Sequence, residues 1–249
     1  MLYAAATMWL MLIVLLAWGV HHLWSGVAKP KVVNSILLPG TLVAQLGHVF
    51  GLLITGGTVN NMALMTDDES GAPQTPADPK PRVPVIGPIL VALLPMVALG
   101  CAIYAAVSWI GAPIMRHMPI EPYVPPELPA SVAAFWGQLR NLITLCERTV
   151  EAIRQVQLLE WRNGLFIYLL ICMSVRMAPL PGNLRGHLGA VLLTGVLAAV
   201  LGSVFPSVPQ SLAGSWPVVT LTVATLMLLL MASLLIRGLI GLGQMLAKG

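Results

Sequence analysis

The stretch AAATMWLMLIVLLAWGVHHLW, residues 4–24, contains no acidic residue, lysine or arginine. A membrane-spanning helix needs about 20 mostly apolar residues, because each residue rises about 1.5 Å and the hydrocarbon core is about 30 Å thick. A cleaved export signal has a shorter apolar core, of about 7–15 residues, and begins with basic residues, which this N-terminus lacks. We therefore expect residues 4–24 to be a retained membrane span.

The composition of the whole chain points the same way. Of 249 residues, 57% are hydrophobic and 9% are charged, against roughly 25% charged in a soluble domain. The formal charge is +4, but lysine and arginine are scattered rather than clustered, so we expect no nucleic-acid partner. Cys101, Cys146 and Cys172 lie far apart in the sequence and are expected to be inert buried thiols. The lipid bilayer is the first expected partner.

Six apolar segments follow one another: residues 4–24, 35–57, 85–110, 164–179, 184–205 and 216–246. The second is interrupted by Pro39 and Gly40, which predicts an extended lead-in, a short helix over residues 41–55 and a left-handed stop at Gly56-Gly57. The last is long enough to tilt or to project past the bilayer. The predicted fold is all-α, a polytopic membrane bundle of about six spans with one further amphipathic interfacial helix.

Polar and proline-rich stretches divide the chain into regions. The linker MTDDESGAPQTPADPKPRVP begins at residue 65 and joins the second and third spans. We expect five regions: residues 1–64 with two spans, 65–84 as linker, 85–130 with the third span and a proline-rich connector, 131–162 as the amphipathic helix, and 163–249 with three spans. Lysine and arginine divide almost evenly between the two sides, so the orientation stays open. We expect a bacterial or archaeal inner membrane.

The amphipathic segment of residues 131–162 combines apolar residues at three- and four-residue steps with charges on its other side. Ser131 is placed to cap its N-terminus. Its charges nearly balance, so attraction to anionic lipid should be weak. We therefore expect it to pack on this chain's own spans or on another membrane subunit, and the expected partner-binding residues are Phe135, Leu139, Ile143, Val150 and Ile153.

The run LLPGTLVAQLGHVFGLLITGG, residues 37–57, resembles the first active-site helix of membrane-embedded site-two-type zinc metallopeptidases. In that family a Pro-Gly turn opens a helix with His-Glu-x-x-His, in which two histidines bind zinc and the glutamate activates the metal-bound water. The segment APLPGNLRGHL, residues 178–188, is similar to the later motif, in which an aspartate supplies the third ligand.

This chain departs from the family's pattern at the residues that carry the chemistry. Ala44 stands at the first histidine, Gln45 at the glutamate and Asn183 at the aspartate, and only His48 is retained. These changes remove charge, as expected of a membrane protein that no longer holds a dication. The resemblance thus implies a pseudoprotease-like scaffold or accessory subunit with no catalytic residue and no cofactor.

Other interpretations remain open. An active zinc metallopeptidase would have to add His187, His21 or His22 to His48 as ligands. A small transporter or channel component would use the broken spans and their few polar groups. In a third interpretation the segment has only a structural role. Gln45 and His48 would then make hydrogen bonds between helices, and the small residues Ala44, Gly47 and Gly51 would let helices approach closely.

Overall fold

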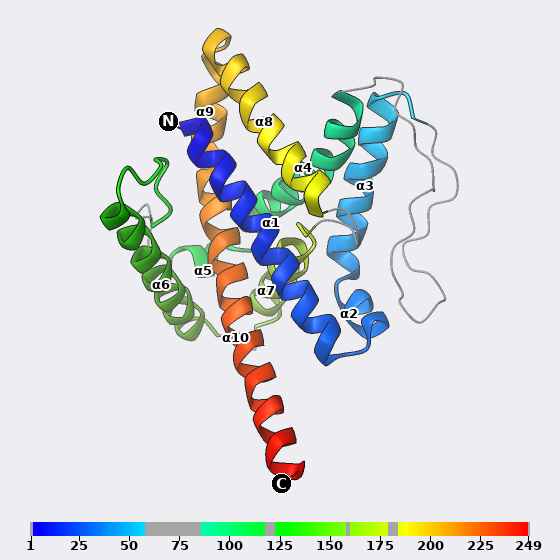
Figure 1. Ribbon diagram of the computed structural model, residues 1–249, viewed down its shortest axis with the longest axis vertical. Helices are drawn as coiled ribbons and strands as arrows, with labels where there is room; N and C mark the ends of the chain where they lie inside the picture. The colour runs from blue at the N-terminus through cyan, green and yellow to red at the C-terminus, as the bar shows by residue number, and fades with distance from the viewer. Residues whose placement is uncertain (1, 58–85, 118–122, 158–159, 179–183, 249) are drawn as a thin grey trace.

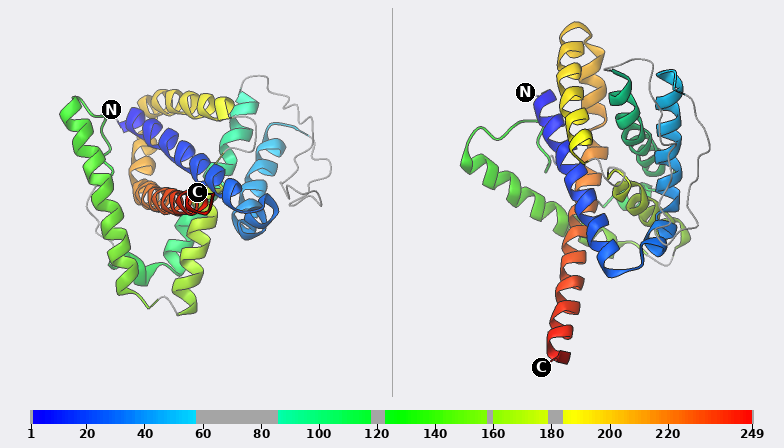
Figure 2. Two further views of the ribbon diagram at one scale, coloured as in Figure 1. Left: turned by 60° about the horizontal axis from the view of Figure 1, so that its bottom comes forward. Right: turned by 45° about the vertical axis from the view of Figure 1, so that its right-hand side comes forward.

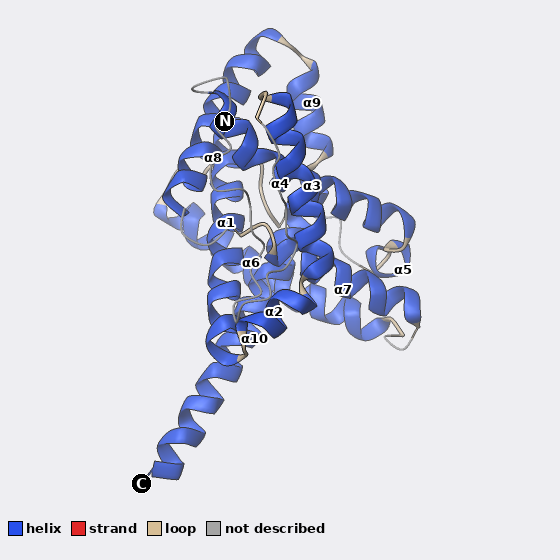
Figure 3. Cartoon of the chain, turned by 90° about the vertical axis from the view of Figure 1, so that its right-hand side faces the viewer, coloured by secondary structure: helices blue, strands red, loops and turns tan. Residues whose placement is uncertain are grey.

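The computed structural model describes residues 2–57, 86–117, 123–157, 160–178 and 184–248. Helix is the only regular secondary structure in these ranges, which confirms the predicted all-α class (Figures 1 and 3). The helices in chain order are α1 Leu2–Val27, α2 Pro30–Ile36, α3 Leu38–Ile54, α4 Ile86–Trp109, α5 Ala112–Met115, α6 Val132–Gln155, α7 Trp161–Val175, α8 Leu184–Val204, α9 Ser207–Gly214 and α10 Trp216–Lys248.

Within these ranges, four helical segments are long and apolar enough to cross a membrane: α1, most of α4, most of α8 and residues 207–246. The α2–α3 pair becomes a fifth if the two helices form one span, and they are bent by 77°. The expected count of six is therefore not confirmed. The difference lies in α7, whose 15 residues extend only about 22 Å, less than the thickness of the hydrocarbon core.

The lead-in to the second apolar segment is helical, so the expected extended conformation is wrong. The Leu37 N–H donates to the Val33 carbonyl and the Thr41 N–H donates to the Leu37 carbonyl, so helical hydrogen bonding continues into and out of the bend. Pro39 lies in the first turn of α3, where a missing N–H costs nothing. At the other end Gly56 has φ 73°, which confirms the predicted left-handed stop.

The core of the bundle forms around α1, which packs against α10 and α8, while α3 packs closely against α4 (Figure 2). Trp9 and Ile13 of α1 and Phe166 of α7 are among its largest fully buried side chains. The indole of Trp9 donates to the Pro125 carbonyl at 3.0 Å, which ties the proline-rich connector to α1.

The C-terminal part of α10 extends past the other helices (Figures 1 and 2). Its side chains there, including Leu239, Leu242 and Met245, are exposed. The last apolar segment thus projects beyond the other helices.

Candidate functional site

Helix α3, which carries Ala44, Gln45 and His48, is held by its glycines against two other helices. A Cβ atom added to Gly40 would collide with the Cys172 carbonyl of α7. A Cβ on Gly47 would lie 2.7 Å from both the Leu94 carbonyl oxygen and Pro95 Cα of α4. These contacts let backbones meet with no side chain between them, which is how small residues tighten membrane helix pairs.

His48 makes a hydrogen bond to α4 that follows from a proline in that helix. Pro95 lies inside α4 and, lacking an N–H, cannot bond the Val91 carbonyl one turn earlier. The His48 ring hydrogen-bonds the Val91 backbone. Its Nε2 finds no partner among the residues described, so the donor is Nδ1–H. His48 therefore satisfies a carbonyl that its own helix leaves unpaired.

The other positions of the motif have different surroundings. Gln45 is 4% exposed, and its Oε1 has no hydrogen-bond partner within the described ranges. Ala44 is partly buried against the core. His187, in the first turn of α8, comes close enough to His48 for their charges to interact. Asn183 lies outside the described residues.

His48 and His187 are thus brought into the same region, as a metal site would require. A search of the described side chains finds no group of three or more His, Cys, Asp or Glu residues placed to hold a metal ion. His21 is placed elsewhere, beside Arg176 and His22. Of the histidines considered from sequence, the structure therefore associates only His187 with His48.

The second candidate region is α6, and one face of it packs inward. Ser131 caps the helix by accepting a hydrogen bond from the Ala134 N–H at 3.1 Å, as predicted. Leu142, Leu145, Cys146, Thr149 and Ala152 are buried, and the helix contacts α10 and α5. Burial also raises the pKa of the Cys146 thiol, with a smaller contribution from Glu147.

The outward face of α6 carries a second apolar stripe. Trp136, Ile143 and Val150 are 59%, 47% and 43% exposed, and their seven-residue spacing places them on one line along the helix. Of the expected partner-binding residues, Phe135 is also exposed, whereas Leu139 and Ile153 are half-buried. Trp136 was not among the expected partner-binding residues, although its seven-residue spacing from Ile143 could have indicated it.

Charged residues accompany this stripe. The exposed charges are Arg140, Glu147, Arg148, Glu151 and Arg154, and Arg148 donates to Glu151 at 3.1 Å. On the inner side of α6, Thr149 and Ile153 line a cavity of about 120 Å³. Thr225 and Leu228, near the middle of the apolar part of α10, line the same cavity. α6 therefore presents charge level with the middle of α10, a helix long and apolar enough to cross a membrane.

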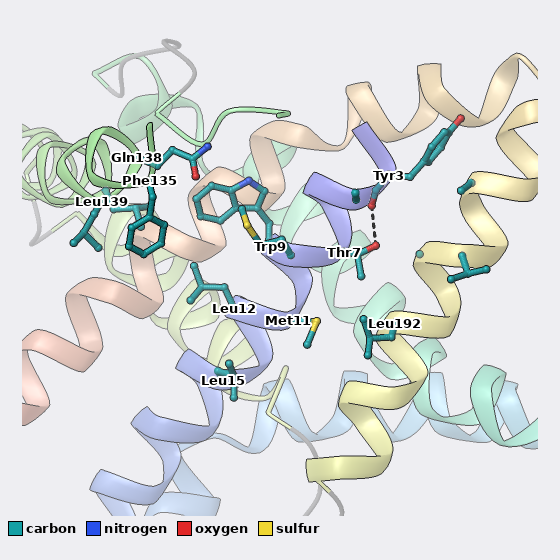
Figure 4. Close-up of a pocket in the computed structure, with 16 residues that line it drawn as sticks. Tyr3, Thr7, Trp9, Met11, Leu12, Leu15, Phe135, Gln138, Leu139 and Leu192 are labelled. Atoms are coloured by element: carbon teal, nitrogen blue, oxygen red, sulfur yellow. Dashed lines mark hydrogen bonds between the residues drawn. The ribbon is translucent and has the colours of Figure 1, made fainter. Parts of the chain in front are cut away.

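A large apolar cavity, of about 740 Å³, separates the first half of α6 from α1 and α8. Phe135 and Leu139 lie on one side and Leu192 on the other, with Leu12 of α1 between them (Figure 4). The few polar groups in its lining bond within the chain: the Thr7 hydroxyl donates to the Tyr3 carbonyl, and the Gln138 amide donates to the Glu127 carbonyl. The cavity thus offers an apolar surface beside α6.

Comparison with protein-family models, curated proteins and solved structures finds no match.

Proposed function

We propose that this chain is a non-catalytic membrane protein, an accessory or scaffolding subunit that binds another membrane protein through the outward face of α6. In this proposal α3 is a pseudoprotease-like helix whose former site residues now serve packing. The observation that most supports this proposal is the row of exposed charged residues on the outward face of α6, at the level where its inner face meets the middle of α10.

The surroundings of α6 favour a protein partner over lipid. Charged side chains facing hydrocarbon are costly, and in membrane proteins they face other protein or water. The charges here have both signs and stand beside Trp136, Ile143 and Val150. An interface with apolar anchors flanked by complementary charges suits this pattern. The cavity next to Phe135 and Leu139 offers a further apolar surface for a partner's transmembrane helix.

The contacts of α3 support a structural role for the motif. His48 is engaged with the Val91 carbonyl, and Gly47 admits the α4 backbone. Gln45, which stands at the position of the family's catalytic glutamate, cannot act as a base near neutral pH. A helix used this way holds the bundle together and leaves recognition to α6.

The test is the mass of the protein extracted from its native membrane in mild detergent. We expect a complex heavier than the 26.5 kDa chain, containing at least one other membrane protein. The triple variant Trp136→Ala, Ile143→Ala, Val150→Ala should lose that partner while its helical content stays unchanged.

The matched control removes three exposed apolar side chains from α8, with Val200→Ala, Leu201→Ala and Val204→Ala. This variant should keep the partner. A wild-type chain that is monomeric, an assembly of this chain alone, or equal partner retention by both triples would each contradict the proposal.

A zinc metallopeptidase with unusual ligands is the second candidate, favoured by the approach of His187 to His48. It predicts about one zinc per chain in the purified protein, lost in a His48→Ala variant. Protein that takes up no zinc when dialysed against it would argue against this candidate.

A further inference from the structure

The junction of α1, α2 and α10 contains a second apolar pocket, of about 200 Å³. Its walls come from the end of α1, from α2 and from the second half of α10, including Val27, Val32, Ile36 and Ile236. Because α2 is bent 77° from α3, it runs across the bundle direction if α3 stands upright in the membrane. The pocket would then lie at the boundary between hydrocarbon and water.

Two polar side chains that line this pocket make hydrogen bonds within the chain. The Trp24 indole donates to the Ser233 hydroxyl at 2.7 Å, and that hydroxyl donates to the Leu229 carbonyl. Tryptophan is also the residue that concentrates at membrane interfaces. The pocket therefore presents an apolar wall, suited to a hydrocarbon chain, and its Trp24 is consistent with an interfacial position.

Cationic residues are neighbours, in the chain, of residues that line the same pocket. Lys29 and Lys31 are exposed and adjoin the lining residues Ala28 and Val32 in the chain. Arg237 follows the lining residue Ile236 and lies against the end of α1, with its Nη1 3.2 Å from where a Gly26 Cβ would be. Three residues able to bind a phosphate thus directly follow or precede residues that line a pocket suited to an acyl chain.

A fourth cation approaches α2 from inside the bundle. Arg176 donates from Nη2 to Asn34 Oδ1 at 2.7 Å, and its Nε lacks a partner in the described part of the chain. Acidic residues in the described ranges are Glu127, Glu147, Glu151 and Glu160, on α6 or in the segments beside it. None lies on α1, α2 or α10 to neutralise these cations.

We propose that this pocket binds an anionic phospholipid, with part of one acyl chain between Val27, Val32 and Ile236 and the phosphate held by Lys29, Lys31 and Arg237. Basic pockets between membrane helices recognise such headgroups. The proposal does not depend on the function proposed for α6, because the two surfaces share no residue.

The experiment is native mass spectrometry of the purified full chain in detergent doped with phosphatidylglycerol or phosphatidylcholine. We expect one phosphatidylglycerol retained in preference to phosphatidylcholine. The triple variant Lys29→Gln, Lys31→Gln, Arg237→Gln should weaken that binding by at least about tenfold. Arg140→Gln, Arg154→Gln, Arg162→Gln removes the same charge elsewhere and should bind like wild type.

Further variants distinguish binding of the lipid headgroup from binding of its acyl chain, and they control for misfolding. Ala28→Phe fills the pocket and should lose the lipid with all cations present, whereas Ala133→Phe, on the exposed start of α6, should not. The double variant Lys29→Gln, Lys31→Gln leaves the contact of Arg237 with α1 intact and should still weaken binding.

Equal retention of both lipids, or equal weakening by the two charge-matched triples, would overturn the proposal. Inorganic phosphate that binds as tightly as phosphatidylglycerol, together with normal binding by Ala28→Phe, would identify a free-phosphate site instead and would overturn the lipid assignment.

Discussion

Helices α3 and α6 both carry polar residues in a chain that has few of them. The polar side chains of α3 face the bundle, and the charged side chains of α6 face outward. On α3 the polar groups, Gln45 and His48, are neutral and turned into the bundle, where glycines bring α4 within backbone contact. On α6 the polar groups are charged and turned outward, beside Ile143 and Val150. The difference indicates where polar recognition can occur, because the polar face of α3 is covered by neighbouring helices, whereas the charged face of α6 is exposed.

The largest expected effect is a loss of unfolding free energy on the buried face of α6, compared with its exposed face. Leu145→Ala should lower the free energy of unfolding by about 2–5 kcal/mol, because it empties a buried position. Ile143→Ala, two residues away and exposed, should change it by less than about 0.5 kcal/mol. Unfolding in mixed SDS micelles measures both, and similar losses would show that the outer stripe is part of the core.

The next test concerns the contact of α3 with α4. Gly47→Ala should destabilise the protein by about 1–3 kcal/mol, because the new methyl group would overlap the α4 backbone. Gly100→Ala in α4 has open space around its Cβ and should be neutral or stabilising by up to about 1 kcal/mol, since alanine favours helix. A stable Gly47→Ala variant would mean that the two helices are further apart.

A double-mutant cycle tests the role of His48. His48→Ala should cost about 1–3 kcal/mol of unfolding free energy, because it leaves the Val91 carbonyl unpaired. Combined with Pro95→Ala, which restores an N–H able to reach that carbonyl, the cost should largely disappear. Additive losses in the double variant would refute this role, and a dependence on added zinc would favour the metallopeptidase alternative.

The smallest expected effect concerns the start of α6. Ser131→Ala removes the acceptor for the Ala134 N–H and should cost about 1 kcal/mol or less, given that the site is exposed. Ser131→Asp keeps an acceptor and should match the wild-type protein. Circular dichroism during thermal unfolding distinguishes the two, and a loss in both would point to a role for the hydroxyl other than capping.

Much of the fold could be predicted because its signals are local. Hydrophobic runs and a 3.6-residue period follow from helix geometry, so the class of protein, the amphipathic helix, its cap at Ser131 and the stop at Gly56 were predictable. The limits were local too: Pro39 suggested an extended lead-in, yet residues 30–36 form a helix, because a proline in a first turn permits a helix on either side of a bend.

The candidate site was less predictable because its contacts join distant parts of the chain. The sequence directly shows the neutral residues Ala44 and Gln45 and the seven-residue spacing of Trp136, Ile143 and Val150. The contact of His48 with the Val91 carbonyl, which lacks its usual N–H donor because residue 95 is proline, depends on how α3 packs against α4. The sequence by itself thus determined an all-helical chain with several segments apolar and long enough to span a membrane, and a short second segment with few charges. Only the tertiary structure decided which faces are closed and which stay open, because burial depends on the neighbours a helix meets and not on its own residues.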